Sequence, residues 1–438
     1  MSTPLHSAIW PDSAAISAGR LQIGGCDSVA LAAEYGTPLY VFDEATLRGT
    51  MRAYLAAFTR LGAAFRVHYA SKALLNTALA QIIAQEGLGL DVVSGAELLI
   101  ARRAGVPMER VHMHGNAKSD AELERAVAWG VGAVVADSLD ELERLAALTA
   151  GSTVPQGLLL RVAPNIDAHT HAHIATGGAG SKFGLPLAAL DAAVERVLAA
   201  PGLRLLGLHA HIGSQLFELA ELQAAVAVLV AQAARLYARF GLVLEELSPG
   251  GGLGVAYTPE QPATDVGAYA EALVGALRAS CAEHGMALPR LTIEPGRSIV
   301  ARAGVALYSV VGRKLAADGS VQYLHIDGGM ADNIRPSLYG ARYTALLASR
   351  ADAPAGAPVD VAGRYCESGD VLLRDVALPP AAPGDLLAVA TAGAYTLSMA
   401  STYNLVPRPA VLIVANGSAR LMQRRETEEE LLARDVAL

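Results

Sequence analysis

Cysteine is scarce in this chain, which holds only three, Cys26, Cys281 and Cys366, among 438 residues. The three are widely spaced and odd in number, which argues against a disulfide framework and against a zinc site. We therefore expect a reduced, cytoplasmic protein with no bound metal. Cys366 stands out because it lies in the polar segment RYCESGD (364–370), whereas buried cysteines usually have apolar neighbours.

Signals for export and membrane insertion are also missing. The N-terminal stretch MSTPLHSAIWPDSAA has neither a basic n-region nor an apolar h-region, so we expect no signal peptide. No uninterrupted apolar run reaches transmembrane length. The formal net charge of −8 argues against nucleic acid or an anionic membrane as the main partner. The expected partner is a small molecule, which includes a small anion held by local arginines.

The composition favours a large globular core, because 53% of the residues are hydrophobic and 17% are charged. A chain of 438 residues exceeds one ordinary core, so two domains are expected. Between about residues 36 and 302, short apolar or β-branched runs alternate with stretches of helical period. The eight short runs are FRVHYA (65–70), LGLDVV (88–93), RVHMHG (110–115), GAVVAD (132–137), LLLRVA (158–163), RLLGLHAH (204–211), LEELSPG (244–250) and LTIEPG (291–296).

This alternation predicts an α/β fold, a (β/α)8 TIM barrel of eight strand–helix units. Three helical stretches begin with the Ser-x-x-Glu pattern of a reciprocal capping box, at 94–97, 119–122 and 138–141. A doubly wound open sheet is the alternative. It more often shows a glycine-rich turn after its first strand, and the sequence has none there.

The rhythm changes after about residue 303, where strand-like runs such as QYLHID and PAVLIVANG are separated by Gly, Pro and Asp. We predict a second, mainly β domain of sandwich or barrel-like form. The predicted domain limits are 36–302 for the barrel, and 1–35 with 303–438 for the β domain.

The candidate site lies at the carboxyl ends of the barrel strands, where such barrels place their chemistry. The run Gly250–Gly252 follows the seventh predicted strand, and Arg297 follows the eighth. These two loops typically bind phosphate, and glycines let backbone N–H groups face an anion. A tight turn without a ligand is the alternative, but the neighbouring arginine loop favours phosphate.

A lysine at the end of an inner strand can form a Schiff base with a carbonyl cofactor. Lys72, Lys118 and Lys182 are all candidates, and their contexts alone do not choose between them. Pyridoxal 5'-phosphate (PLP) combines an aldehyde with a phosphate, and its ring nitrogen needs a partner. Glu294 could supply that partner, because a carboxylate favours the protonated ring, which suits decarboxylation. His211 could stack on the ring or be an ordinary core histidine.

Nine longer motifs follow one another along the chain: YASKAL, LDVVSGAEL, LHAHIGSQ, GGGLG, EPGRSIV, DGGMADNIRPSLYGARY, CESGD, AGAYTLSMASTYN and RRETEEELL. With these motifs the chain resembles the diaminopimelate decarboxylase family, PLP enzymes of alanine racemase-like fold, over about residues 30–435. The resemblance implies a barrel with a β domain, and PLP as cofactor. It also implies decarboxylation of meso-2,6-diaminopimelate to L-lysine and CO2, the last step of lysine biosynthesis.

The resemblance also implies a role for each site residue. Lys72 becomes the Schiff-base lysine, and His211 stacks on the ring. The implied cofactor-binding residues are Lys72, Asp91, His211, Ser214, Gly250, Gly251, Gly252, Glu294 and Tyr395. The implied substrate-binding residues are Arg297, Arg335, Tyr339, Glu367 and Tyr395. Arginine suits the distal carboxylate of diaminopimelate because it binds carboxylate bidentately.

By the same resemblance the enzyme is a homodimer with active sites at the subunit interface, and CESGD (366–370) reaches the site of the neighbouring subunit. Cys366 would then donate the proton that replaces CO2, and Glu367 would bind the distal ammonium group. One segment departs from the family pattern: TGGAG, after the fifth strand, is less acidic than expected. The loop at 165–184 is therefore undefined in detail.

Other functions are compatible with the same fold. A decarboxylase of ornithine or arginine is disfavoured, because those substrates end in a cation that Arg297 and Arg335 would repel. Alanine racemase chemistry is disfavoured by Glu294, since an arginine there would keep the ring nitrogen neutral. A decarboxylase of a modified amino acid stays open. A non-catalytic relative would be expected to lose Lys72 or Cys366, and both are present.

Overall fold

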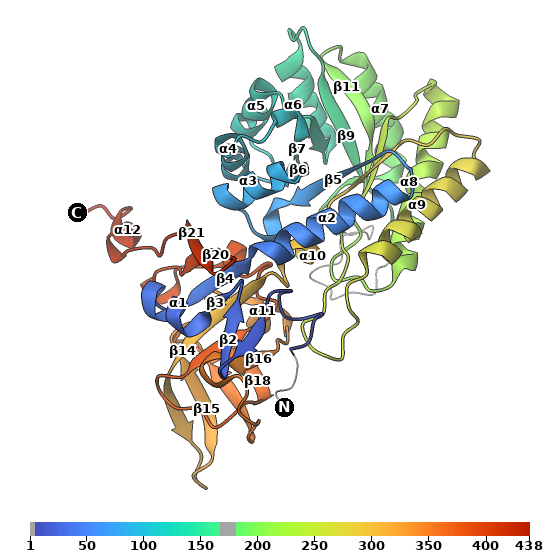
Figure 1. Ribbon diagram of the computed structural model, residues 1–438. Helices are drawn as coiled ribbons and strands as arrows, with labels where there is room; N and C mark the ends of the chain where they lie inside the picture. The colour runs from blue at the N-terminus through green and yellow to red at the C-terminus, as the bar shows by residue number, and fades with distance from the viewer. Residues whose placement is uncertain (1–4, 167–180) are drawn as a thin grey trace. The chain divides into compact units, whose positions relative to one another are not determined.

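The computed structural model describes residues 5–166 and 181–438, which form two compact units (Figure 1). The barrel unit comprises Thr50–Gly254 and Asp265–Gly296. The second unit comprises the chain up to Gly49, Val255–Thr264 and Arg297–Leu438. The domain limits given above, 36–302 for the barrel, stay a prediction.

The barrel unit is built on eight parallel strands that close on themselves in the order β5-β6-β7-β8-β9-β11-β12-β13, with β13 paired to β5. All eight predicted strand runs are confirmed, and so is the predicted fold class. A two-residue strand, β10 (Leu185–Pro186), extends the sheet beside β9. The barrel strands are β5 (Phe65–Ala70), β6 (Gly89–Val92), β7 (Val111–Met113), β8 (Ala133–Ala136), β9 (Gln156–Ala163), β11 (Leu203–His209), β12 (Glu246–Gly250) and β13 (Arg290–Ile293).

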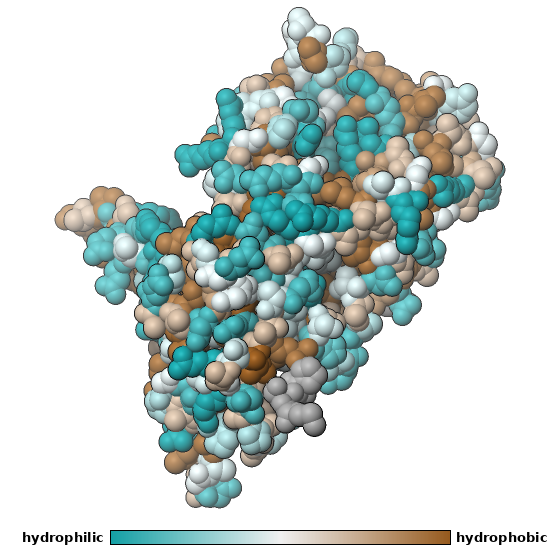
Figure 2. Space-filling view, in the orientation of Figure 1, coloured by the Kyte–Doolittle hydropathy of each residue, from teal (hydrophilic) through white to brown (hydrophobic). Residues whose placement is uncertain are grey.

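Helices cover the outside of these strands (Figure 1). They are α2 (Glu44–Arg60), whose first residues belong to the second unit, α3 (Thr77–Gln85), α4 (Gly95–Arg103), α5 (Asp120–Trp129), α6 (Leu139–Thr149), α7 (Leu190–Ala199), α8 (Leu219–Phe240) and α9 (Val266–Glu283). The exposed side of α2 carries charged residues, and Figure 2 shows a hydrophilic band along it. The buried side of α2 carries Leu47, Met51, Tyr54 and Phe58, so the helix is amphipathic.

The predicted helix starts are present, although only one is a complete capping box. The Ser119 side chain caps α5 by accepting from the Glu122 N–H, and the Glu122 carboxylate accepts in turn from the Ser119 N–H. Ser94 and Ser138 also cap their helices, α4 and α6. There the third-position glutamate accepts instead from the N–H of the residue before the serine. In α4 and α6 the glutamate therefore holds the backbone one residue before the cap, while the helix still begins directly after the serine.

Helix α8 is, among the described residues, long and apolar enough by length and composition alone to cross a membrane. Its buried residues recur every three or four positions, and it packs against α9 and β12. Arg235 and Arg239 on the same helix form ion pairs with Asp191 of α7. This single buried stripe is typical of a helix that covers a barrel.

The second unit is mainly β. A three-stranded sheet contains β1 (Ala15–Ser17), β2 (Arg20–Ile23) and β3 (Cys26–Asp27). A nine-stranded sheet is mostly antiparallel, and only the pairs β15–β17 and β4–β20 are parallel. Its strands are β4 (Leu39–Asp43), β14 (Gly304–Leu315), β15 (Val321–Ile326), β16 (Ala345–Leu347), β17 (Pro358–Ala362), β18 (Val371–Ala377), β19 (Leu386–Val389), β20 (Ala410–Ala415) and β21 (Ser418–Gln423).

Four helices of this unit are α1 (Ser28–Tyr35), α10 (Arg297–Val300), α11 (Arg335–Tyr339) and α12 (Glu428–Leu432). The core of the unit gathers Ile9 and Trp10 with residues of the two sheets, among them Leu39, Val305 and Leu412. Strand β4 is central to it: all five of its residues are buried, and it pairs with both β14 and β20. A strand buried on both faces reads as a continuous apolar run in any sheet.

Candidate active site

The structure brings four of the predicted cofactor residues to one end of the barrel. Lys72 lies in a short 3-10 helix, Ser71–Ala73, directly after β5, and its side chain is exposed. Asp91 lies in the neighbouring strand β6, where it is the register partner of Ala70. Glu294 directly follows β13, on the other side of β5. His211 follows β11, and the charge of Lys72 acts on both His211 and Asp91.

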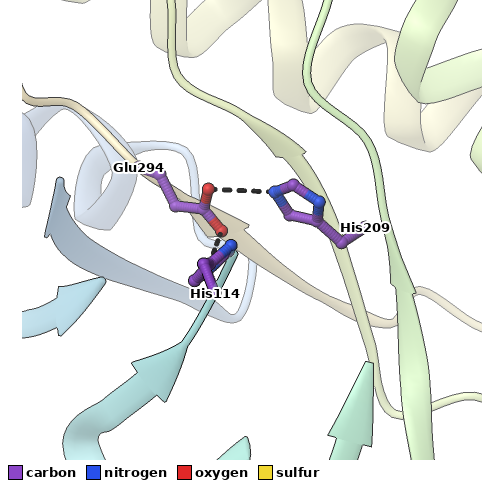
Figure 3. A group of neighbouring side chains, drawn as sticks. All are labelled: His114, His209 and Glu294. Carbon is purple, nitrogen blue, oxygen red and sulfur yellow. Dashed lines mark hydrogen bonds and ion pairs between the residues drawn. The ribbon is translucent and has the colours of Figure 1, made fainter. Parts of the chain in front are cut away.

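Glu294 is held through both oxygens of its buried carboxylate (Figure 3). His209 Nε2 lies 3.0 Å from Oε2. The Ser248 hydroxyl donates to Oε1 at 2.9 Å. His114 Nε2 lies 3.6 Å from Oε1. Burial alone would raise the pKa of Glu294, but the two histidines and the serine hydroxyl hold it well below its ordinary value. Glu294 is therefore the ionised carboxylate of this cluster.

Asp91 shows the opposite shift. Burial, and then the charge of Glu294, raise the pKa of Asp91 well above its ordinary value. Its Oδ1 atom is buried without a hydrogen-bond partner in the described part of the chain. Two neighbouring carboxyl groups whose pKa values are pushed apart are typical of acid–base sites.

The three candidate lysines differ sharply in their surroundings. The Lys118 ammonium is buried and donates to Gly115 O, Val135 O and Glu141 Oε1, each at 2.7 Å. An ammonium has three hydrogens, so every hydrogen of the Lys118 ammonium is already used in a hydrogen bond. Lys182 is exposed, with its ammonium 5.0 Å from the centre of the Phe183 ring. Of the three, Lys72 therefore has the placement and the availability that a Schiff-base lysine needs.

The glycine run after β12 is required by close packing. A Cβ on Gly250 would lie 2.7 Å from His211 Nδ1, and one on Gly251 would lie 2.1 Å from Glu294 O. Gly250 and Gly252 also have positive φ angles, 78° and 116°. The Gly250 N–H donates to Ser248 Oγ, so the amides of Gly251 and Gly252 stay the candidates for phosphate. Ser214, the other predicted phosphate ligand in this unit, lies half-buried three residues after His211.

Arg297 and Arg335 lie together in the second unit, in a buried cluster with aromatic residues. Arg297 Nη1 donates to the Tyr257 hydroxyl at 2.7 Å, and the Arg335 guanidinium carbon lies 4.5 Å from the centre of the Tyr257 ring. Arg335 also donates to the Tyr343 hydroxyl. The Arg297 guanidinium carbon lies 4.7 Å from the centre of the Tyr395 ring. Two cations in one cluster of tyrosines favour an anionic ligand.

Tyr257 and Tyr343 are not among the site residues predicted from the sequence. Tyr343 ends the motif DGGMADNIRPSLYGARY, four residues after Tyr339. Tyr257 lies in the connection between β12 and α9, far in sequence from Arg335, and only the folded structure joins them. Tyr339 itself is half-buried at the end of α11, one helical turn after Arg335.

The segment CESGD is a surface loop between two buried residues, Tyr365 and Asp370. Cys366 and Glu367 are exposed, whereas Tyr365 and Asp370 are buried. The Asp370 carboxylate accepts hydrogen bonds from the backbone N–H groups of Tyr365 (2.8 Å) and Met330 (2.7 Å). The aspartate therefore fixes the loop, and the cysteine and glutamate are presented outward.

A second contact holds the Cys366 backbone. Its N–H donates to Asn404 Oδ1 at 2.9 Å, and the Tyr403 hydroxyl donates to its carbonyl oxygen at 3.2 Å. Asn404 has a φ angle of 55°, a conformation that asparagine tolerates better than most residues. Much of the predicted loop at 165–184 lies outside the described residues.

Comparisons with known proteins agree with this geometry. The family model described as pyridoxal-dependent decarboxylase, pyridoxal binding domain, matches residues 45–301. The diaminopimelate decarboxylase of Actinosynnema pretiosum subsp. auranticum is 46% identical over 435 residues, 99% of this chain and 96% of that protein. That of Bacillus subtilis is 43% identical over 420 residues, 95% of each chain.

The chain belongs to the diaminopimelate decarboxylase family. A solved structure of this family, the M. jannaschii diaminopimelate decarboxylase in complex with L-lysine, matches with a TM-score of 0.91, at 32% identity and over 98% of both chains. In this family the enzyme depends on PLP, as the matched pyridoxal binding domain indicates. The resemblance inferred from the motifs is thus confirmed.

The barrel residues fit this cofactor. Lys72 is an accessible amine at a strand end, and Asp91 carries a buried oxygen without a hydrogen-bond partner among the described residues. The ligand atoms of His114, His209 and Glu294 lie within 4.8 Å of one another, a spacing that a metal ion could also use. We assign this cluster to hydrogen bonding, because His209 and Ser248 each occupy one oxygen of Glu294.

Proposed function

We propose that this chain decarboxylates meso-2,6-diaminopimelate to L-lysine and CO2 with PLP, as the last step of lysine biosynthesis. The observation that carries the substrate assignment is the pair Arg297 and Arg335, which share Tyr257 in one buried cluster. A bidentate arginine clamp suits a substrate that ends in a carboxylate. The same clamp disfavours ornithine and arginine, whose distal groups are cationic.

In the barrel, the proposed roles belong to residues that hold the cofactor. Lys72 binds it covalently, His211 packs on its ring, and Glu294 holds a proton on the ring nitrogen. Ser214, the loop Gly250–Gly252 and Tyr395 bind its phosphate, and within the loop the donors are the Gly251 and Gly252 N–H groups. When bound, PLP supplies an electron-withdrawing ring that accepts the electron pair left when CO2 departs. Asp91, whose carboxyl favours the protonated form, lies beside the charge of Lys72.

The remaining roles concern the substrate. Arg297, Arg335 and Tyr339 hold its distal carboxylate, and Glu367 accepts hydrogen bonds from its distal ammonium group. Cys366 Sγ delivers a proton to the carbon that has lost CO2. That the thiol and the carboxylate of this loop are both exposed, on a backbone fixed by Asp370, supports a role towards a molecule outside the chain's own core.

We further propose that the enzyme is a cytoplasmic homodimer with active sites at the subunit interface. In this arrangement each subunit supplies Cys366 and Glu367 to its partner's site. The support is the exposure of these two side chains at the tip of a pinned loop, since a proton donor has to be shielded from water when it acts. A partner subunit would provide that shielding.

The test is product identification. Purified protein is incubated with meso-diaminopimelate, with and without added PLP, and the mixture is analysed by mass spectrometry. L-lysine and CO2 in equal amounts, dependent on PLP, are expected. Consumption of the substrate without lysine, or an unchanged substrate in the presence of bound PLP, would contradict the proposal.

A further inference from the structure

The interior of this barrel is unusually rich in histidine. Barrel interiors are usually filled by bulky branched side chains. Here His68, His112, His114 and His209 are all buried, with exposed fractions of 4% or less. Their ring centres are 4.0 Å apart for His68 and His112, 6.5 Å for His112 and His114, and 5.0 Å for His114 and His209. The row ends at Glu294, and Figure 3 shows its last two rings, His114 and His209, beside that carboxylate.

Three neighbouring strands place Glu294 and its two hydrogen-bond donors. Strands β11, β12 and β13 are adjacent, and His209 of β11 is the register partner of Ser248 of β12. Glu294 directly follows β13. The two donors therefore approach the carboxylate from positions that the sheet itself fixes, one to each oxygen.

The direction of both hydrogen bonds is determined. A carboxylate only accepts, so His209 Nε2 carries the hydrogen that faces Glu294. The Ser248 oxygen accepts from the Gly250 N–H at 3.1 Å, which leaves its own hydrogen for Glu294 Oε1. Ser248 thus connects the glycine loop to the carboxylate, and neither donor can turn away without losing a buried bond.

We propose that His209 and Ser248 are positioning residues that keep Glu294 ionised and aimed at the ring nitrogen of the bound cofactor. This inference rests on the proposed function, because it concerns the same ring nitrogen. His114 contributes less, since its Nε2 is 3.6 Å from Glu294 and lies beyond hydrogen-bond reach. Without the two donors, Glu294 would be a buried carboxylate beside Asp91, and one proton would be shared between the two groups.

The charged groups around Glu294 agree with this arrangement. Burial is the first cause that lowers the pKa of His114, and it brings the pKa of His112 to about 3, so the His112 ring is neutral at pH 7. The pKa of Asp91 is raised, so this carboxyl takes up a proton more readily. The negative charge of the cluster therefore rests on Glu294, where a protonated ring nitrogen needs it.

The experiment reads the ring nitrogen directly. Holoenzyme is loaded with PLP isotope-labelled at the pyridine nitrogen, and the nitrogen NMR shift is recorded without substrate. We expect His209→Leu and Ser248→Ala to move the signal towards that of an unprotonated pyridine. His209→Gln and Ser248→Thr retain a donor and should stay near the wild type. His68→Leu, which removes a buried histidine away from Glu294, is the matched control and should leave the signal in place.

Kinetics supply the second readout. His209→Leu and Ser248→Ala should each lower kcat about 10–100-fold, the scale typical of a lost outer hydrogen bond to a catalytic ligand, while KM changes little. If His209→Leu does not fold, Ser248→Ala decides the question, because it removes only one hydroxyl. A wild-type nitrogen shift in the variants, or an equal shift in His68→Leu, would overturn the inference.

The two proposals can fail separately. A wild-type protein that binds no PLP would contradict the proposed function, whatever the variants do. A wild-type holoenzyme with a protonated ring, together with variants whose nitrogen signal does not move, would contradict only the positioning role of His209 and Ser248.

Discussion

Arg297 donates a 2.7 Å hydrogen bond to the hydroxyl oxygen of Tyr257, so a phenol helps to orient this buried guanidinium. The same phenol ring lies against the guanidinium of Arg335. A neutral tyrosine contacts both cations without adding a negative charge to the cluster. A carboxylate in its place would pair with the arginines and compete with the distal carboxylate of the proposed substrate.

The Tyr257 hydroxyl should therefore matter for substrate binding. Tyr257→Phe removes the hydrogen bond to Arg297 and keeps the ring beside Arg335. We expect KM for meso-diaminopimelate to rise about 10-fold or more, because a hydrogen bond to a charged group is worth about 1.5–3 kcal/mol, while kcat stays near the wild type. Steady-state kinetics measure this, with Tyr269→Phe in the barrel unit as the matched control. A fall in kcat at constant KM would assign Tyr257 a different role.

A pH dependence follows from the same cluster. Burial opposes ionisation of Tyr257, but the charges of Arg297 and Arg335 outweigh it and lower the pKa of this phenol. As the pH rises through that lowered pKa, a phenolate forms, pairs with the arginines and competes with the substrate carboxylate. KM should therefore rise at alkaline pH in the wild type, and Tyr257→Phe should flatten the rise. Parallel pH profiles of KM for both proteins would exclude this competition.

Much of this architecture follows from local sequence. The eight strand runs were predictable because each is a short β-branched or apolar stretch, and three of the helices between them begin with a capping serine. The membership of β4 was not predictable, because LYVFD would be equally buried in either sheet. Long-range pairing, and not local propensity, places it between β14 and β20.

The site was predictable only in part. Lys72, Glu294 and His211 follow from their positions at strand ends, whereas the choice between Lys72 and Lys118 depended on the resemblance to a family. The structure shows the physical difference: the Lys118 ammonium donates all three of its hydrogens to acceptors inside the protein. The approach of Ser248 to Glu294 depends on cross-strand register, which a single sequence does not reveal.

Lys118 should stabilise the fold and not act in catalysis. Lys118→Met leaves the Glu141 carboxylate buried without its cation, which should lower the free energy of unfolding by about 3–5 kcal/mol. Chemical denaturation measures this, and the exposed Lys182→Met is the matched control. Lys118→Met holoenzyme should keep the visible absorption of lysine-bound PLP, which Lys72→Ala should lose. Loss of that absorption in folded Lys118→Met would contradict the assignment of Lys72.

The proton-donor role of Cys366 predicts a large kinetic effect. Cys366→Ala should lower turnover roughly 10²–10⁴-fold, the scale of a lost general acid, with a smaller change in substrate binding. If the loop serves the partner's site, then mixing Cys366→Ala with Lys72→Ala subunits should restore activity, because one mixed site is intact. Two inactive variants that stay inactive in a verified mixed dimer would place Cys366 in its own subunit's site.

The most direct test of the account is a CO2-release assay that compares meso-diaminopimelate, ornithine, arginine and lysine on the wild-type enzyme with PLP. If the arginine cluster around Tyr257 binds the distal carboxylate, as proposed, only meso-diaminopimelate should be decarboxylated at a substantial rate. Release of CO2 from ornithine or arginine, with none from meso-diaminopimelate, would contradict the substrate assignment.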